Sequence, residues 1–124
     1  RDAEDTLSEI GVYSILAAQQ GATPYILKMH AAFHSGGDVW LVLEHADQGD
    51  LFDRIAAGPQ DMQETLRWMW QLLQAVAYLH SRRIGHRDIS VENILLCGGT
   101  VRLMDFGQAV ATETQDRVPL RYFR

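Results

Sequence analysis

Apolar residues recur at helical spacing in two segments of the chain. In residues 4–20, Leu7, Ile10, Tyr13 or Ser14, and Ala17 recur on one face of a predicted helix, and Gly21 ends the run. Residues 61–81 carry a longer stripe with the same period and predict a second helix. This stripe consists of Met62, Leu66, Met69, Leu72 or Leu73, Val76 and Leu79 or His80, with Trp68 and Trp70 broadening it. We expect its Trp and Met side chains to belong to the core.

Strand-like apolar runs around glycine turns predict two hairpins. Residues 24–46 predict two strands around a turn at 35–38, and the first of these strands would include Ile26 and Leu27. A second hairpin is predicted over 94–106, with two consecutive glycines at its turn.

The remaining segments complete the predicted order of elements. Residues 49–58 predict a short helix that Gly58 ends, and from Gly107 onward no period is sustained, which predicts a long loop. Helix, strands, helices, hairpin and loop in this order predict an α+β fold.

Composition and charge narrow the class of protein. The 124 residues suit one domain or part of one, and 47% of them are apolar, which is enough for a packed core. The net charge of -5 argues against a nucleic-acid binder. The single cysteine, Cys97, favours a reducing, cytoplasmic compartment, and we find no apolar run that predicts a membrane span. The polar N-terminus without Met leads us to expect a piece of a longer protein.

Five polar residues interrupt the apolar segments on either side of the second hairpin: His86, Arg87, Asp88, Asn93 and Asp105. The hairpin is expected to bring the last three to one end. Carboxylate and amide oxygens there suit Mg²⁺, and the ion suits nucleotide phosphates. Asp88 would then orient a hydroxyl group and accept its proton. The alternative is a structural loop whose acidic residues only cap turns.

The stretch "HRDISVEN" followed by "DFG" resembles the catalytic loop and metal-binding motif of eukaryotic protein kinases. The resemblance implies ATP and Mg²⁺ as cofactors, Asp88 as the base, and Asn93 and Asp105 as metal ligands. Arg87 would be the partner of a phosphate on the activation loop, at Thr112 or Thr114. These threonines could equally be ordinary polar loop residues.

The stretch "VWLVLEHADQGDLF" resembles the strand, hinge and helix start that bind adenosine in this family. By this resemblance Leu43 is the gatekeeper, and the backbone of Glu44 and Ala46 binds the adenine. Asp50 would face the ribose, and Leu95 would form the floor under the adenine. The alternative is a plain strand with a polar end.

The first helix resembles the one that carries a glutamate paired with the nucleotide-binding lysine. Glu9 is better placed for this role than Glu4, and the lysine would lie outside this chain. The alternative for Glu9 is a solvated helix face. Four side chains would then stack as a spine between this helix and the metal-binding motif: Tyr13, Met29, His86 and Phe106.

The resemblance implies a partial, bilobal kinase domain over residues 1–124. Residues 1–43 would be the remainder of the N-lobe, 44–50 the hinge, and 51–124 the start of the helical C-lobe with catalytic loop and activation segment. Neither a glycine-rich loop nor the phosphate-gripping lysine occurs in these residues.

We therefore expect a kinase that transfers the ATP γ-phosphate to serine or threonine hydroxyls of a protein substrate. Ser90 stands where such kinases usually carry a lysine, and Leu120 stands where many carry a threonine. One alternative is a pseudokinase that serves as a scaffold, which Ser90 favours. The other is a small-molecule phosphotransferase, against which Arg87 and Phe106 argue.

Overall fold

A computed structural model describes residues 3–19, 23–112 and 121–122 of the protein. The elements follow the predicted order of a helix, two strands, two helices and a hairpin, with further short strands before and after that hairpin. They are, in order, α1 (Ala3–Ala17), β1 (Met29–Ser35), β2 (Asp38–Leu43), α2 (Leu51–Ala56), α3 (Met62–Ser81), β3 (Ile84–Gly85), the 3-10 helix η1 (Val91–Asn93), β4 (Ile94–Cys97), β5 (Thr100–Leu103), β6 (Val110–Ala111) and β7 (Arg121–Tyr122).

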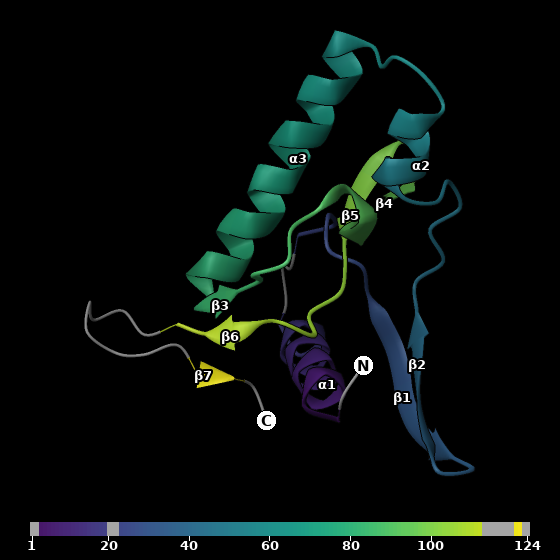
Figure 1. Ribbon diagram of the computed structural model, residues 1–124. Helices are drawn as coiled ribbons and strands as arrows, with labels where there is room; N and C mark the ends of the chain where they lie inside the picture. The colour runs from purple at the N-terminus through teal and green to yellow at the C-terminus, as the bar shows by residue number, and fades with distance from the viewer. Residues whose placement is uncertain (1–2, 20–22, 113–120, 123–124) are drawn as a thin grey trace.

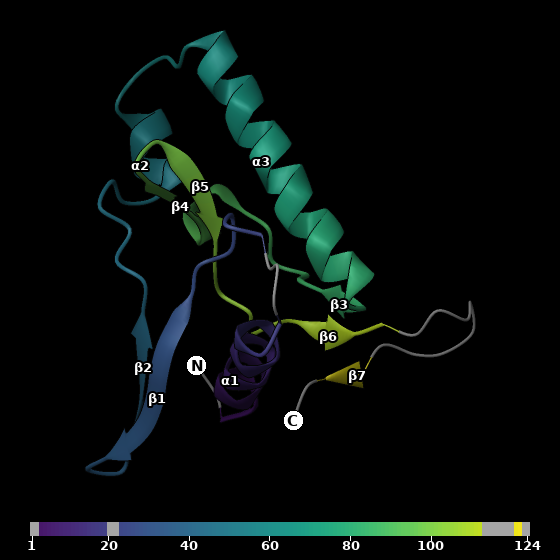
Figure 2. The same ribbon diagram turned by 180° about the vertical axis from the view of Figure 1, so that it is seen from behind.

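The strands form three small antiparallel sheets, which pair β1 with β2, β4 with β5, and β6 with both β3 and β7. The β4–β5 hairpin lies between α2 and α3, and α1 lies near β6 and the β1–β2 hairpin (Figures 1 and 2). Within the described ranges no helix is both long and apolar enough to cross a membrane.

Helix α1 confirms the first predicted helix, but only part of the predicted apolar face is buried. Of the predicted stripe, Tyr13 is buried and Ile10 half-buried, whereas Leu7 and Ala17 are exposed. Val12 and Leu16, which lie outside that stripe, are buried as well. The buried face includes two polar residues at its start, so apolar residues alone do not mark it. The helix also ends at Ala17, three residues earlier than predicted.

The first predicted hairpin forms, but its first strand begins at Met29 instead of residue 24. Residues 25–27 pair with the end of β5: the Leu27 N–H donates to the Leu103 carbonyl at 3.0 Å, and the Leu103 N–H donates to the Tyr25 carbonyl at 2.8 Å. Ile26 and Leu27 are both buried, so this segment lacks the alternation of a strand with one solvated face.

Helix α3 confirms the second predicted helix, with Asp61 capping its N-terminus through a 3.3 Å bond from the Glu64 N–H. Its buried residues are Trp68, Gln71, Ala75 and Leu79. The prediction that the helix's Trp and Met side chains belong to the core is therefore wrong except for Trp68. The exposed members are Met62, Met69 and Trp70, and they lie with Leu66 and Leu73 on the part of the helix that faces water.

The β4–β5 hairpin turns at Gly98 and Gly99, as predicted, and both have positive φ, at 58° and 80°. Such angles are the ones a two-residue hairpin turn requires and glycine adopts without strain. The prediction of an uninterrupted loop after Gly107 is wrong, because β6 pairs with β3.

Candidate functional site

Asp88 and Asn93 are joined by direct hydrogen bonds at one end of the β4–β5 hairpin. The Asn93 Nδ2 donates to the Asp88 backbone carbonyl at 2.9 Å and to its Oδ2 at 3.1 Å. The Asn93 carbonyl in turn accepts from the Met104 N–H at 3.0 Å, so Asn93 lies opposite the residue that precedes Asp105. The structure thus brings the three predicted polar residues to the same end of the hairpin.

Two of the predicted site residues have backbones in the left-handed region, with φ of 68° at Arg87 and 63° at Asp105. This conformation is uncommon for residues other than glycine, and strained backbone of this kind costs about 1–3 kcal/mol per residue. Side chains hold both turns: the Asp105 Oδ1 accepts from the Gly107 N–H at 3.2 Å, and the Arg87 Nε donates to the Gln108 carbonyl at 2.9 Å. The predicted catalytic loop, residues 86–93, is therefore fixed at Arg87 to the segment after Asp105.

His86 is a buried packing residue between these two segments. Its Nδ1 accepts from the Asp88 N–H at 3.1 Å, so its Nε2 carries the hydrogen and donates to the Met104 carbonyl at 2.8 Å. Its ring meets Phe106 edge-on at 5.2 Å, and Phe106 meets Tyr13 edge-on at 5.0 Å. The predicted contact of α1 with the "DFG" segment through these rings is present, and Met29 packs against the same core.

Burial lowers the pKa of His86 below its ordinary value of 6.5, although the Met104 carbonyl and the nearby Asp88 and Asp105 carboxylates act in the opposite direction. Near pH 6.5, His86 therefore binds a proton more readily in the unfolded chain than in the folded chain. We expect the free energy of unfolding to fall as the pH drops below about 6.5, by at most about 1.4 kcal/mol per pH unit from this residue.

Thermal unfolding of the full-length protein between about pH 7.5 and pH 5.5 measures this effect. His86→Gln should flatten the pH dependence. An equal slope in wild type and His86→Gln would contradict the expectation.

The predicted hinge runs beside the β4–β5 hairpin. The Gln48 N–H donates to the Leu96 carbonyl at 3.1 Å, and the Leu96 N–H donates to the Gly49 carbonyl at 2.8 Å. Residues Asp50 and Leu95 form an antiparallel bridge next to these bonds. The segment after Leu43 is therefore held against the strand that carries the predicted adenine floor.

The individual hinge residues differ in their contacts. Leu43 is half-buried and packs against the core, and Ala46 is half-buried. The Asp50 Oδ1 accepts from the Asp53 N–H at 2.8 Å and so caps α2. The Glu44 N–H donates to the Lys28 carbonyl at 2.7 Å. Their contacts with a nucleotide stay predictions.

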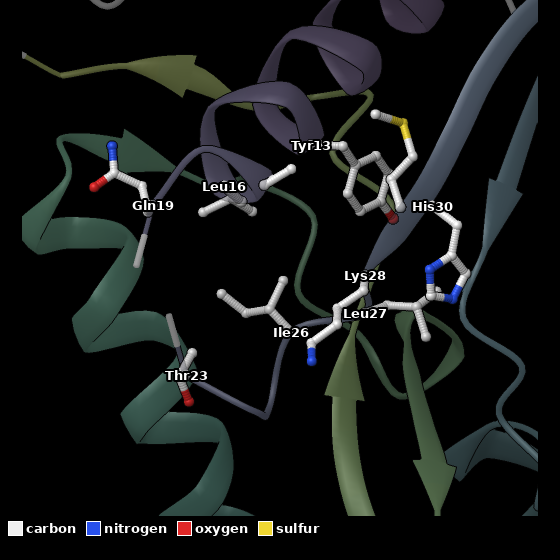
Figure 3. A pocket seen from close by; sticks show the side chains of 10 residues that line it. Tyr13, Leu16, Gln19, Thr23, Ile26, Leu27, Lys28 and His30 are labelled. Atoms are coloured by element: carbon white, nitrogen blue, oxygen red, sulfur yellow. The ribbon is translucent and has the colours of Figure 1, made fainter. Parts of the chain in front are cut away.

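Glu9 is buried in α1, with 5% of its surface exposed, which argues against the solvated helix face. A cavity of about 400 Å³ lies beside the end of the same helix. Figure 3 shows Tyr13 and Leu16 on one side of it and Ile26 and Leu27 on the other. None of the predicted nucleotide or metal residues lines this cavity, so it is separate from the predicted site.

Two side chains of α3 anchor the hairpin through polar atoms, and the reading of the sequence missed both contacts. The Trp68 Nε1 donates to the Gly99 carbonyl at 3.2 Å, and the buried Gln71 Oε1 accepts from the Val101 N–H at 3.0 Å. A glutamine within an otherwise apolar helix face is the only local signal that could have revealed this anchor.

In the described part of the chain, no three His, Cys, Asp or Glu side chains gather into a metal-binding group. The predicted Mg²⁺ site needs only one carboxylate, from Asp105, together with the Asn93 amide oxygen. Carboxylate, amide and phosphate oxygens are suitable ligands for this ion, so the residue types fit. Because the Asn93 Nδ2 points to Asp88, its Oδ1 is the atom left for a ligand role.

The sequence matches the family model of the protein kinase domain over residues 1–122. It is 38% identical over 96 residues to CBL-interacting protein kinase 9 of Oryza sativa subsp. japonica, covering 75% of this chain and 21% of that protein. It is 37% identical over 86 residues to human NUAK family SNF1-like kinase 2, covering 68% and 14%. Aurora kinase A-A of Xenopus laevis is 35% identical over 99 residues, covering 78% and 24%. The matched segments span less than a quarter of the length of these relatives.

Proposed function

This chain belongs to the protein kinase domain family, and we propose that its protein transfers the γ-phosphate of Mg·ATP to serine or threonine hydroxyls of other proteins. The observation that carries the proposal is the hydrogen-bonded pair of Asp88 and Asn93, at the end of the hairpin where Asp105 follows β5. Names of similar proteins, all of them kinases, support the same reading.

In the proposed reaction, one Asp88 carboxylate oxygen orients the substrate hydroxyl group. It accepts the hydroxyl proton as the hydroxyl oxygen attacks the γ-phosphorus. The bond from that phosphorus to the β-phosphate oxygen breaks, and ADP leaves. The Asn93 Nδ2 keeps Asp88 in place, and the Asn93 Oδ1 and the Asp105 carboxylate would hold Mg²⁺. The ion supplies charge neutralisation for the phosphates.

We infer the serine or threonine specificity from Glu92. This residue precedes Asn93, at a position where tyrosine kinases favour arginine. Glu44, Ala46, Asp50, Leu43 and Leu95 are the proposed adenosine contacts. Arg87 is the proposed partner of an activation-loop phosphate, and Glu9 that of the nucleotide-binding lysine. A cytoplasmic location belongs to the proposal too, on the basis of the single cysteine.

We also propose that residues 1–124 are part of a larger two-lobed kinase domain. The division into N-lobe, hinge and C-lobe at 1–43, 44–50 and 51–124 is the one implied by the motifs. The water-exposed apolar residues of α3 support a larger domain, because monomeric proteins rarely leave such surface uncovered.

The full-length protein tests this function. It should transfer radiolabelled phosphate from Mg·ATP to serine or threonine of a generic protein substrate, and Asp88→Asn should lower the rate at least about 100-fold. Labelling of tyrosine alone, or transfer by Asp88→Asn at a rate close to that of the wild type, would contradict the proposal.

A scaffold without catalysis is the second candidate, because Ser90 lacks the positive charge that usually contacts the transferred phosphate. Ser90 is a half-buried residue within the proposed catalytic loop, and its carbonyl accepts from the Asn93 N–H at 3.0 Å. For an active enzyme, Ser90→Lys should raise turnover, by roughly tenfold if one charge-assisted contact is gained, with a smaller change in the Michaelis constant for ATP.

Steady-state kinetics of the full-length protein measure this, with Ser90→Met as a control of similar length without charge. An unchanged or lower turnover in Ser90→Lys would show that a cation at this position does not limit the reaction.

Phosphorylation of the activation loop is a third expectation. The Thr112 N–H donates to the Arg83 carbonyl at 2.8 Å, which ties the start of this loop to the segment before Arg87, and Thr114 lies outside the described residues. A phosphate on either threonine could form charge-assisted bonds with Arg87. Mass spectrometry of the active full-length protein should find it, and full activity in a Thr112→Ala, Thr114→Ala double mutant would exclude a role.

A further inference from the structure

The Glu44 side chain connects the proposed hinge to two other parts of the fold. Its Oε1 accepts from the Lys28 N–H at 3.2 Å, next to the 2.7 Å bond from the Glu44 N–H to the Lys28 carbonyl. Its Oε2 accepts from the Arg102 Nε of β5 at 3.1 Å. The carboxylate therefore links the end of β2 to the segment before β1 and to the β4–β5 hairpin.

Arg102 is itself fixed on its own strand. Its Nη1 donates to the Thr100 Oγ1 at 2.7 Å and to the Val101 carbonyl at 2.9 Å. The guanidinium group therefore approaches Glu44 from one direction with little rotational freedom left to lose, and its planar fork suits such a shared arrangement.

The Glu44–Arg102 pair is also partly removed from water. The side chains of Arg102 and Glu44 are 14% and 20% exposed. The pair of Arg54 and Glu64 has the same 3.1 Å separation, but its side chains are 40% and 27% exposed. Because water screens charges less at the first pair, its loss should have the larger effect.

The position of Arg102 relates this ion pair to the proposed nucleotide site. Arg102 lies directly opposite Leu95 in the hairpin and three residues before Asp105. Leu95 bridges Asp50 on its other side. One side chain thus connects the segment proposed to bind the adenine edge with the hairpin proposed to carry the adenine floor and a metal ligand.

We propose that Arg102 is a positioning residue for nucleotide binding, which acts through the Glu44 carboxylate to hold the hinge backbone at a set distance from the β4–β5 hairpin. This inference rests on the proposed kinase function. The adenine lies between these two segments in that proposal, so a hinge released from β5 binds ATP less well. Arg102 touches neither the substrate hydroxyl nor the transferred phosphate, so the rate at saturating ATP should change little.

The experiment uses the full-length protein with Arg102→Ala, Glu44→Gln and the double mutant. Arg54→Ala is the control, because it breaks the more exposed ion pair of Arg54 with Glu64. Steady-state kinetics give turnover and the Michaelis constants for ATP and for protein substrate. Calorimetric titration with Mg·ATP measures binding without turnover, and thermal unfolding shows that each variant is folded.

We expect Arg102→Ala to raise the Michaelis and dissociation constants for ATP about three- to tenfold, with turnover and the constant for protein substrate nearly unchanged. The double mutant should be no worse than the more affected single mutant, because both remove one interaction. Arg102→Lys keeps the charge and should recover part of the affinity.

Three outcomes would overturn the inference: ATP constants that change no more than in Arg54→Ala, losses in the two single mutants that simply add, or a fall in turnover with ATP affinity intact. Failure of the proposed function looks different. A wild-type protein that binds Mg·ATP and transfers no phosphate contradicts the kinase function, while the titrations still decide the role of Arg102. A wild-type protein that binds no Mg·ATP contradicts both.

Discussion

Asp88→Asn in the full-length protein should lower turnover by about 10²- to 10⁴-fold while leaving the affinity for Mg·ATP largely intact. Asparagine has the shape of aspartate and keeps one acceptor oxygen for the 3.1 Å bond from the Asn93 Nδ2, so the loop should keep its conformation. The variant cannot accept the proton of the substrate hydroxyl. The loss therefore falls on the chemical step.

Asp105→Asn should weaken the affinity for Mg·ATP, which Asp88→Asn leaves largely intact. The Asp105 Oδ1 accepts from the Gly107 N–H at 3.2 Å, which an asparagine oxygen can also do. The metal-binding charge is lost, so Mg·ATP should bind more weakly and turnover should fall as well. Calorimetric titration with Mg·ATP and single-turnover kinetics separate the two effects.

Asp38→Asn is a suitable control, because Asp38 is an exposed carboxylate at the β1–β2 turn. It should change neither quantity. An equal loss of nucleotide affinity in Asp88→Asn and Asp105→Asn would contradict this division of roles between base and metal ligand.

The gathering of these residues could be predicted from the sequence, because it follows from local structure. The consecutive residues Gly98 and Gly99 fix a two-residue turn, and the turn fixes the register that sets Asn93 opposite Met104. Any polar residues just outside the two strands must then lie at one end.

Contacts between distant segments could not be predicted in the same way. The pairing of residues 25–27 with the end of β5, and the ion pair of Glu44 with Arg102, join residues more than fifty positions apart. Neither involves a repeated pattern or a turn motif. The glutamate and the arginine read simply as two surface charges in the sequence, since most such residues are exposed.

Helix α3 shows a second limit of prediction from the sequence. Its apolar period correctly gives the helix, but a helix that contacts neighbours on two sides carries apolar residues on both. The period does not tell which side the described chain covers. The side against β5 is covered, through Trp68, Ala75 and Leu79, and the side with Leu66 and Leu73 is exposed.

The exposed side of α3 gives the last prediction, which concerns the 124-residue chain expressed alone. Leu66 and Leu73 are 60% and 57% exposed, with Met62, Met69 and Trp70 beside them, and apolar surface of this kind promotes association. We expect the isolated chain to form oligomers or aggregates and to transfer no phosphate. Leu66→Glu with Leu73→Glu should shift it toward the monomer in size-exclusion chromatography with light scattering.

The same pair of substitutions should have the opposite effect on the full-length protein. If later helices of the proposed domain cover this face of α3, two carboxylates would be buried without partners, at a cost of about 3 kcal/mol or more in the free energy of unfolding. Gln63→Glu with Gln74→Glu adds the same charge at exposed polar positions of the same helix and should leave both proteins nearly unchanged. A full-length protein that tolerates the Leu66 and Leu73 substitutions as well as this control would show that the face stays open to water there, and that residues 1–124 are not completed by helices packing on α3.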